Sequence, residues 1–497
     1  MTGVEINPLT IKLMKQRFRT FTGGLYDGYP GVQIINDEGR NFVRHSSAQY
    51  DLIQASLVDT WAASAAGAYA LTENNLYTVE AFEDYLRRLT PDGVITFSRW
   101  FAEPPVESLR VVTLAIEALR HQGIVNPALH LFVVRTNQAE TNLPSLGTIL
   151  VKRSPFTEVE ISKLRAWAEQ MRFLIDYAPD DQSRGVSHSE FHQLLSPQSE
   201  QFIAEYPFDI SAVYDDRPFF FNRVPLLPWL ENQLRASSTN TPSPALTLGG
   251  QTLLICLLVT AACTALLLLL PLVAAKWGKG EENAPSLAGM GRGRALLWAV
   301  YFAGLGLGFI MVEIVLIQRF SLFLGYPVYS LSVVLFTILL ASGVGSYLAG
   351  EWVQRQPRLL PRILAVLCVV LIVYAAALPS VLDAVLGMSM PVRIALAALL
   401  VAPLGLLMGM PFPTGLRYAG REASGLVSWA WAVNGGASVF GSTLTVLISM
   451  TYGFSASFLT GACAYAIALG VAIWTTRIAS DKPLTIDLPV TEQAVTD

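Results

Sequence analysis

Seven apolar stretches in the second half of the chain constrain its fold more than any other feature. Crossing a bilayer takes about 20 residues of helix, and the stretches lie near 249–275, 295–318, 328–350, 361–380, 392–412, 425–449 and 455–476. Buried helices of soluble proteins are rarely apolar on every face over such lengths. The pattern predicts an all-α polytopic membrane domain of about seven helices over residues 246–477, with the lipid bilayer as its partner.

The first half of the chain has a different pattern, in which short apolar runs alternate with amphipathic ones. Strands are predicted at 4–6, 32–35, 50–55, 94–97, 129–134 and 148–151, and helices near 8–20, 79–90, 104–122 and 157–172. Such alternation is typical of an α/β domain with a parallel sheet. We expect Thr90-Pro91-Asp92-Gly93 to form a turn before the fourth strand.

Four segments follow from these patterns. We predict an α/β domain over 1–178, a connecting segment and linker over 179–245, the membrane domain over 246–477 and a polar tail over 478–497. The linker includes the stretch Ala236 to Pro244, which is rich in Ser, Thr and Pro.

Composition excludes several classes of protein and of partner. Only 14% of the 497 residues are charged and 52% are hydrophobic, whereas about 25% charged residues is usual, so disorder and coiled coils are excluded. The net charge of -4 gives no general attraction to nucleic acid. All four cysteines fall in the apolar stretches and form no metal or disulfide pattern. Nothing in the sequence defines an oligomeric state.

Several motifs of the first half follow one another in the order of a known family. Val4-Glu5-Ile6-Asn7-Pro8 is similar to its second strand, Glu38-Gly39-Arg40-Asn41-Phe42 to the next acidic turn and Tyr50-Asp51-Leu52-Ile53 to its fourth strand. Leu76 to Phe82 is similar to the helix that follows, and Pro91-Asp92-Gly93-Val94 to the next turn. Together they resemble the spermidine synthase (polyamine aminopropyltransferase) family, which has a Rossmann-like fold of the class I methyltransferase type.

Three further motifs resemble the membrane-fused bacterial branch of that family. They are Asp215-Asp216-Arg217-Pro218-Phe219-Phe220-Phe221, Gly306-Leu307-Gly308-Phe309 and Pro411-Phe412-Pro413-Thr414-Gly415. The resemblance implies a multi-pass protein of a bacterial inner membrane.

The resemblance also implies a set of site residues and a substrate class. Glu5 would hold the ribose of an S-adenosyl-type donor, either decarboxylated S-adenosylmethionine or S-adenosylmethionine, and Glu38, or its neighbour Asp37, would lie at the adenine end. Asp59 would contact a small amine or polyamine substrate. The structural alternatives are a solvent-facing strand end for Glu5 and a helix N-cap for Asp59.

Two departures from the family leave the activity open. The first strand of the family and its glycine-rich loop are absent before Glu5, so we expect an unpaired sheet edge unless another segment fills the gap. Ser56 stands where the family has its proposed base, and an unassisted hydroxyl is no base near neutral pH. Two hypotheses therefore stay open. The domain either transfers a group to an amine, or it binds a ligand without catalysis as part of a membrane carrier or sensor.

Glu313 is the acidic residue that lies deepest in an apolar stretch. A carboxyl group in a membrane span usually faces the bundle interior or a wet cavity. Glu313 is therefore expected either to bind a cation or relay a proton, or to pair with Arg319 or a neighbouring polar group. It would be the central residue of a carrier.

Three other groups of residues have structural explanations. His188 and His192 lie at zinc-like spacing but lack a third ligand, and we expect a solvated helix there. Asp215-Asp216 is expected to dock the soluble domain on the membrane, with Phe219 to Phe221 and Trp229 as interfacial aromatics. The run Gly343-Val344-Gly345-Ser346 is expected to let helices approach closely.

Two opposing signals in the sequence leave undecided on which side of the membrane the soluble domain lies. Basic residues gather in the loops far from the soluble domain, which by the positive-inside rule would place that domain outside the cell. S-adenosyl donors, in contrast, are cytoplasmic, and the chain does not begin with a signal peptide.

Overall fold

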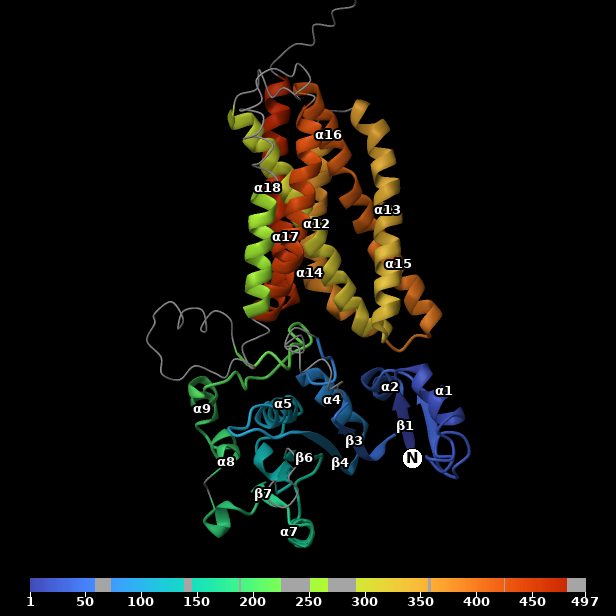
Figure 1. Cartoon of the computed structure of the whole chain (residues 1–497), viewed down its shortest axis with the longest axis vertical. Coiled ribbons are helices and arrows are strands. Elements are labelled where there is room, and N and C mark those ends of the chain that lie inside the picture. Colours follow the sequence, from blue (N-terminus) through green and yellow to red (C-terminus); the bar gives the residue numbers. More distant parts are fainter. Residues whose placement is uncertain are drawn as a thin grey trace, which may run out of the picture.

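The protein consists of an N-terminal α/β region and a C-terminal bundle of long helices (Figure 1). The computed structural model describes residues 1–58, 73–137, 145–186, 189–224, 251–266, 292–355, 359–423 and 425–480. The sequence-based fold class is confirmed, because an α/β sheet domain precedes an all-helical region.

Within the described residues, seven strands form two separate sheets. A parallel pair consists of β1 (Thr2–Glu5) and β2 (Gln33–Asn36). The second sheet has the order β3-β4-β6-β5-β7, and its strands are β3 (Tyr50–Ser56), β4 (Leu89–Trp100), β5 (Leu131–Arg135), β6 (Leu146–Lys152) and β7 (Leu174–Tyr177). Only β3 and β4 pair in parallel there, because β6 is antiparallel to both β4 and β5 and β7 is antiparallel to β5. The sheet is therefore mixed rather than purely parallel.

The helices of the α/β region are amphipathic and cover the second sheet or flank the first. They are α1 (Pro8–Gln16), α2 (Gly39–His45), α4 (Val79–Arg88), α5 (Glu107–His121), α7 (Glu158–Gln170), α8 (Glu190–Leu194) and α9 (Ser199–Glu205). The main core lies between α4, α5 and β4, where the rings of Phe82 and Phe97 stack with centroids 4.7 Å apart.

Among the described strands the two sheets do not join. Strands β1 and β3 each pair on one side only there, so each leaves an unpaired sheet edge. On β3, the apolar side chain of Leu52 is 56% exposed.

The expected turn at 90–93 is wrong. Strand β4 already begins at Leu89, which lies opposite Tyr50, and the pairing resumes with Leu52 opposite Val94. Pro91, Asp92 and Gly93 therefore form an irregularity within the strand, where proline is tolerated because it need not donate to the ladder.

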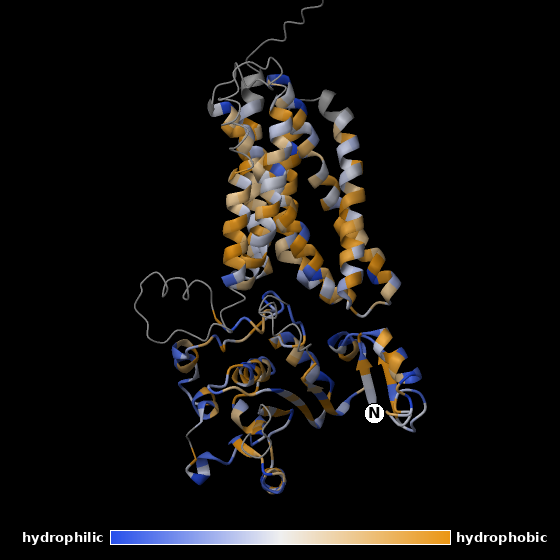
Figure 2. Cartoon of the chain, viewed as in Figure 1, coloured by the Kyte–Doolittle hydropathy of each residue, from blue (hydrophilic) through white to orange (hydrophobic). Residues whose placement is uncertain are grey.

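Long apolar helices make up the second region, which Figure 2 shows as largely hydrophobic. Their bounds are α12 (Arg292–Leu324), α13 (Pro327–Arg355), α14 (Leu359–Ala384), α15 (Met390–Gly409), α16 (Pro411–Glu422), α17 (Gly425–Tyr452) and α18 (Phe454–Ser480). Within the described residues six segments are long and apolar enough to cross a membrane, with α15 and α16 forming one of them. The first of the seven predicted spans, 249–275, corresponds among the described residues to a shorter apolar helix, Gln251–Leu266.

Helices α13 and α15 approach closely at two glycines. A Cβ atom on Gly345 would overlap the carbonyl oxygen of Leu406, and one on Gly409 would overlap that of Ser342. Gly343, two residues before Gly345, has open space at the same position. The close helix approach expected for 343–346 is confirmed, and it depends on Gly345 rather than Gly343.

Candidate functional site

The carboxyl ends of β1 and β2 point towards the helical bundle (Figure 1). Glu5 ends β1, and Asp37 and Glu38 directly follow β2. Oε1 of Glu5 accepts a hydrogen bond from the amide of Asn7 at 2.8 Å. Since ligands of open α/β sheets bind outside the carboxyl ends of the strands, this edge is the candidate donor site.

Glu38 and Asp37 have different roles at this edge. Glu38 caps α2, with Oε1 accepting from the amide of Arg40 at 3.1 Å and Oε2 from that of Asn41 at 2.7 Å. Burial raises the pKa of Glu38. Oδ1 of Asp37 accepts from the side-chain amide of Asn41 at 2.7 Å. The same oxygen of Asp37 also accepts from the backbone amide of Glu38 at 2.8 Å, and the Asp37 side chain is hydrogen-bonded to Tyr326 as well. Both acids are therefore engaged, but only Glu38 has both carboxylate oxygens on the helix cap.

Two residues of the helical bundle contact the turn that holds Asp37 and Glu38. The hydroxyl of Tyr326, between α12 and α13, donates to the carbonyl of Asn36 at 3.1 Å. Burial, with a contribution from Asp37, raises the pKa of Tyr326 to about 12. Nη1 of Arg393, at the start of α15, donates to Oδ1 of Asn41 at 3.1 Å and to the carbonyl of Phe323 at 2.8 Å. The candidate donor edge therefore lies against the helical bundle.

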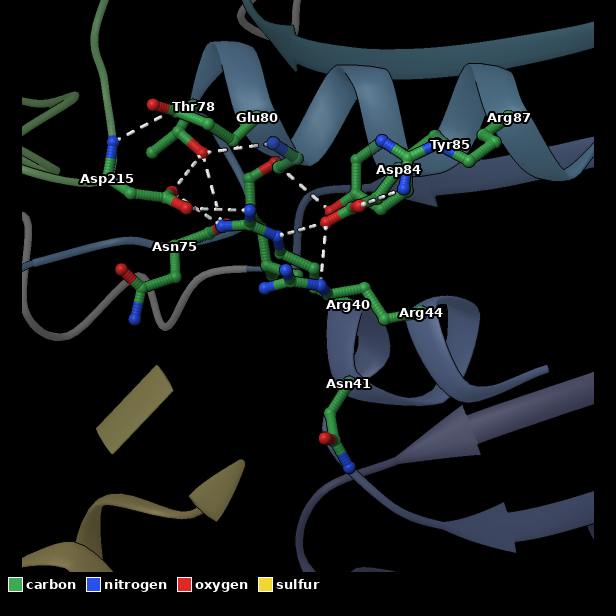
Figure 3. A network of polar contacts seen from close by, with 12 residues as sticks. Arg40, Asn41, Arg44, Asn75, Thr78, Glu80, Asp84, Tyr85, Arg87 and Asp215 are labelled. Carbon is green, nitrogen blue, oxygen red and sulfur yellow. Dashed lines mark hydrogen bonds and ion pairs between the residues drawn. The ribbon is translucent and has the colours of Figure 1, made fainter. Parts of the chain in front are cut away.

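Arg40 is the centre of a buried network that holds α2 against α4 (Figure 3). Its side chain is fully buried, and Nε donates to Asp84 at 3.0 Å. Nη1 and Nη2 donate to the two oxygens of Asp215 at 2.6 and 2.8 Å. The hydroxyl of Thr78 donates to Asp215 at 2.7 Å. No local pattern in the sequence could reveal that Arg40 has a partner 175 residues away.

Asp216 fixes the α/β region to the bundle. Oδ1 of Asp216 accepts from Nη2 of Arg319 at 2.8 Å and from the backbone amide of Ser455 at 3.0 Å. The carbonyl of Asp216 accepts from the amide of Phe454 at 2.7 Å, so both ends of the residue bind the first turn of α18. The expected docking role of Asp215-Asp216 is confirmed for Asp216.

The aromatic run after this turn is divided between two cores. Phe219 belongs to the core of the bundle, and its ring lies 5.9 Å from that of Phe454. Phe220 and Phe221 are buried in the core of the α/β region. The prediction of interfacial aromatics is therefore wrong for these two, and Trp229 lies outside the described residues.

Replacing Asp216 with Ala should loosen the first turn of α18. The variant loses a charge-assisted hydrogen bond to Ser455 and the partner of Arg319, each worth about 1.5–3 kcal/mol. Hydrogen exchange followed by mass spectrometry should show faster exchange in the peptide that spans 453–458, while the peptide at the start of α13 keeps its rate. Unchanged exchange at 453–458 would show that Asp216 does not hold this turn.

The remaining candidates of the soluble half lie apart from the donor edge or outside the described residues. Ser56 ends β3, and its hydroxyl lies 3.4 Å from that of Ser98. Asp59, the candidate amine contact, lies outside the described residues, and so does His188. His192 bonds to Asp181 at 3.0 Å, and the described part of the chain holds no group of three metal-binding side chains.

Glu313 lies within α12 and is 8% exposed. Its expected pairing with Arg319 is wrong, because Arg319 binds Asp216 and Ser455 instead. Among the described residues Glu313 has no hydrogen-bond or ion-pair partner. It remains a buried carboxyl group of the bundle with an unassigned role.

The fold is that of an α/β sheet domain followed by an all-helical region, which has six candidate membrane spans among the described residues. Residues 1–140 match the family model described as the spermine/spermidine synthase domain. The N-terminal segment is therefore a spermine/spermidine synthase domain, as the resemblance of its motifs implied, and six long apolar helices follow it. These helices suggest a multi-pass membrane protein. No curated protein matches the chain.

Proposed function

We propose that the protein is a bacterial inner-membrane transferase that moves a group from an S-adenosyl-type donor to a small amine. The observation that carries this proposal is the pair of acids, Glu5 and Asp37, at the carboxyl ends of two parallel strands within the matched segment. Ligand binding at such strand ends is a general property of open α/β sheets.

The proposed donor contacts follow from the positions of the acids at this edge. Glu5 would accept hydrogen bonds from the ribose hydroxyls, and Asp37 would take the adenine-side role that the sequence divided between Asp37 and Glu38. Glu38 is better suited to its cap, because its two oxygens already bind backbone amides.

The proposed reaction needs a group that accepts a proton. The amine nitrogen would form a bond to the donor carbon next to the sulfonium, the carbon–sulfur bond would break with its electrons going to sulfur, and the amine would lose a proton. The Ser56 hydroxyl is hydrogen-bonded to another serine, and general-base catalysis needs a group with a pKa near the working pH. Asp59 is the proposed acceptor of this proton and contact of the amine.

A binding experiment tests the donor site directly. Calorimetry of the full chain in detergent should detect decarboxylated S-adenosylmethionine or S-adenosylmethionine, and Glu5→Gln and Asp37→Asn should each weaken binding about 10- to 100-fold, the value of one charge-assisted hydrogen bond. Asp27→Asn is the matched control, because Asp27 forms a surface ion pair with Arg19 in the same segment. Absence of binding of both donors to the unaltered chain would refute the proposal.

A membrane carrier or sensor with a non-catalytic ligand-binding domain is the second candidate. The observation that favours it is Glu313, a buried carboxyl in a candidate span with no partner among the described residues. Formation of a transferred product from the donor and an amine separates the two candidates, because a non-catalytic domain can bind a ligand but transfers no group.

A further inference from the structure

A cavity of about 210 Å³ lies at the junction of the two regions, where the start of α4 meets the ends of α12 and α14 and the start of α18. Both regions line it, and its wall is part charged and part apolar. The α/β region contributes Arg44, Glu80, Asp215 and Asp216, and the bundle contributes Arg319, Asp383 and a set of apolar side chains. The cavity is separate from the donor edge, whose acids Glu5 and Asp37 do not line it.

Three of the four lining carboxylates already have cationic partners. Asp215 is bound by both terminal nitrogens of Arg40. Asp383 accepts from Nη2 of Arg44 at 3.1 Å, and Asp216 accepts from Nη2 of Arg319 at 2.8 Å. The negative charges of these three acids are therefore already compensated by arginine side chains.

Glu80 is the exception. Its Oε2 accepts a hydrogen bond from the backbone amide of Asp215 at 3.0 Å, and no cationic side chain of the described residues lies within ion-pair distance of it. Burial, together with the negative charge of Asp215, raises the pKa of Glu80 to about 7. The carboxyl group therefore lacks a counter-charge at the place where the cavity opens beside it.

The charges of the wall leave an excess of negative charge. Four acidic and two basic side chains line the cavity. Behind the wall Arg40 and Arg87 both pair with Asp84, which still leaves one negative charge in excess. A metal ion such as Ca²⁺ needs six to eight oxygen ligands, whereas most of these oxygens are bound to guanidinium groups. The apolar part of the wall, from Leu322, Phe323 and Phe454, suits a hydrocarbon chain instead.

We propose that this junction cavity binds an organic cation, with a primary ammonium group on the Glu80 carboxylate and the carbon chain against Leu322 and Phe323. The ammonium group supplies the missing counter-charge of Glu80 and donates hydrogen bonds to it, and the apolar contacts remove the chain from water. This goes beyond the proposed transfer reaction, because the site needs no S-adenosyl donor and no chemistry.

Calorimetric titration of the full chain in detergent with n-butylamine at pH 7 tests the proposal, with 1-butanol as the uncharged probe. Binding should release roughly half a proton, because the cation favours the ionised form of a group that is half protonated at this pH. The release is measured by comparing buffers of different ionisation enthalpy. We expect n-butylamine to bind and 1-butanol to bind at least tenfold more weakly.

Two variants and a matched control make the result specific. Glu80→Gln should weaken n-butylamine binding at least tenfold and abolish the proton release. Glu83→Gln, on the same helix but paired with His121 at 2.7 Å, should change neither. Leu322→Trp should block binding by filling the cavity without changing its charge, which keeps the test valid if Glu80→Gln fails to fold.

The outcomes separate this site from the proposed function. Equal binding of n-butylamine to the unaltered chain and to Leu322→Trp, or no binding to the unaltered chain, overturns the junction site. Binding of S-adenosyl donors should be the same in Glu80→Gln as in the unaltered chain. Loss of donor binding alone overturns the proposed function and leaves the cation site standing.

Discussion

Replacing Arg40 with Met should destabilise the α/β region by about 3–5 kcal/mol, the usual cost of leaving a buried charge without its partner. Arg40 is fully buried and binds Asp84 and Asp215 at once. The substitution leaves Asp215 without a cationic partner, whereas Asp84 keeps its ion pairs with Arg44 and Arg87. Thermal unfolding of the full chain in detergent, followed by circular dichroism, measures the loss. Arg19→Met, which removes a surface ion pair, should change stability by less than about 1 kcal/mol.

The pH dependence of the Arg40 variant provides a second measurement. Burial alone would raise the pKa of Asp215, but the charge and hydrogen bonds of Arg40 bring it below its ordinary value. The contribution of the pair is therefore present at neutral pH and is lost as the pH falls below about 4, the ordinary pKa of Asp. In Arg40→Met the Asp215 carboxyl group is easier to bury when protonated, so stability should rise as the pH is lowered. A variant as stable as the unaltered protein at pH 7 would contradict the assigned role.

Replacing Gly345 with Ala should separate α13 from α15. The new Cβ atom meets the backbone oxygen of Leu406, and a backbone atom cannot rotate away, so the helices must shift at a cost of about 3 kcal/mol, the upper range for overpacking. Unfolding of the purified chain by increasing mole fractions of sodium dodecyl sulfate measures this loss.

Gly343→Ala is the matched control on the same helix. The Cβ atom of this variant enters open space, and alanine favours the helix over glycine by about 1 kcal/mol. The control should therefore be as stable as the unaltered protein or slightly more so. Equal behaviour of the two variants would mean that α13 and α15 do not meet at Gly345.

Regular patterns in the sequence predicted the elements that form through local periodicity. The strand predicted at 94–97 lies within β4, and the helices predicted near 79–90 and 104–122 correspond to α4 and α5. Each has a clear apolar pattern, and α4 also has a recognisable beginning at its N-cap Thr78. Helix α2 was not predicted because its seven residues are too few to show a period.

The site was less predictable than the fold because its contacts join distant parts of the chain. Glu5 and Asp37 were found from the strand ends, which are local features. In contrast, the hydrogen bond between Arg393 and Asn41 joins residues 352 positions apart. The preference for Asp37 over Glu38 required the hydrogen bonds of the α2 cap, which only the structure provides.

The separation of β1 and β2 from the other strands has a consequence for local unfolding. A two-stranded sheet is only marginally stable by itself in water, whereas β4 pairs with a strand on each side and contributes to a buried core. The short pair is tied to its surroundings largely through α2, whose side chains bind α4 and the ends of α14 and α15. The opening free energy of β1 and β2 is thus set by contacts with the bundle as well as by the pair itself. Removing the membrane helices would release the strands that carry Glu5 and Asp37 while leaving the larger sheet intact.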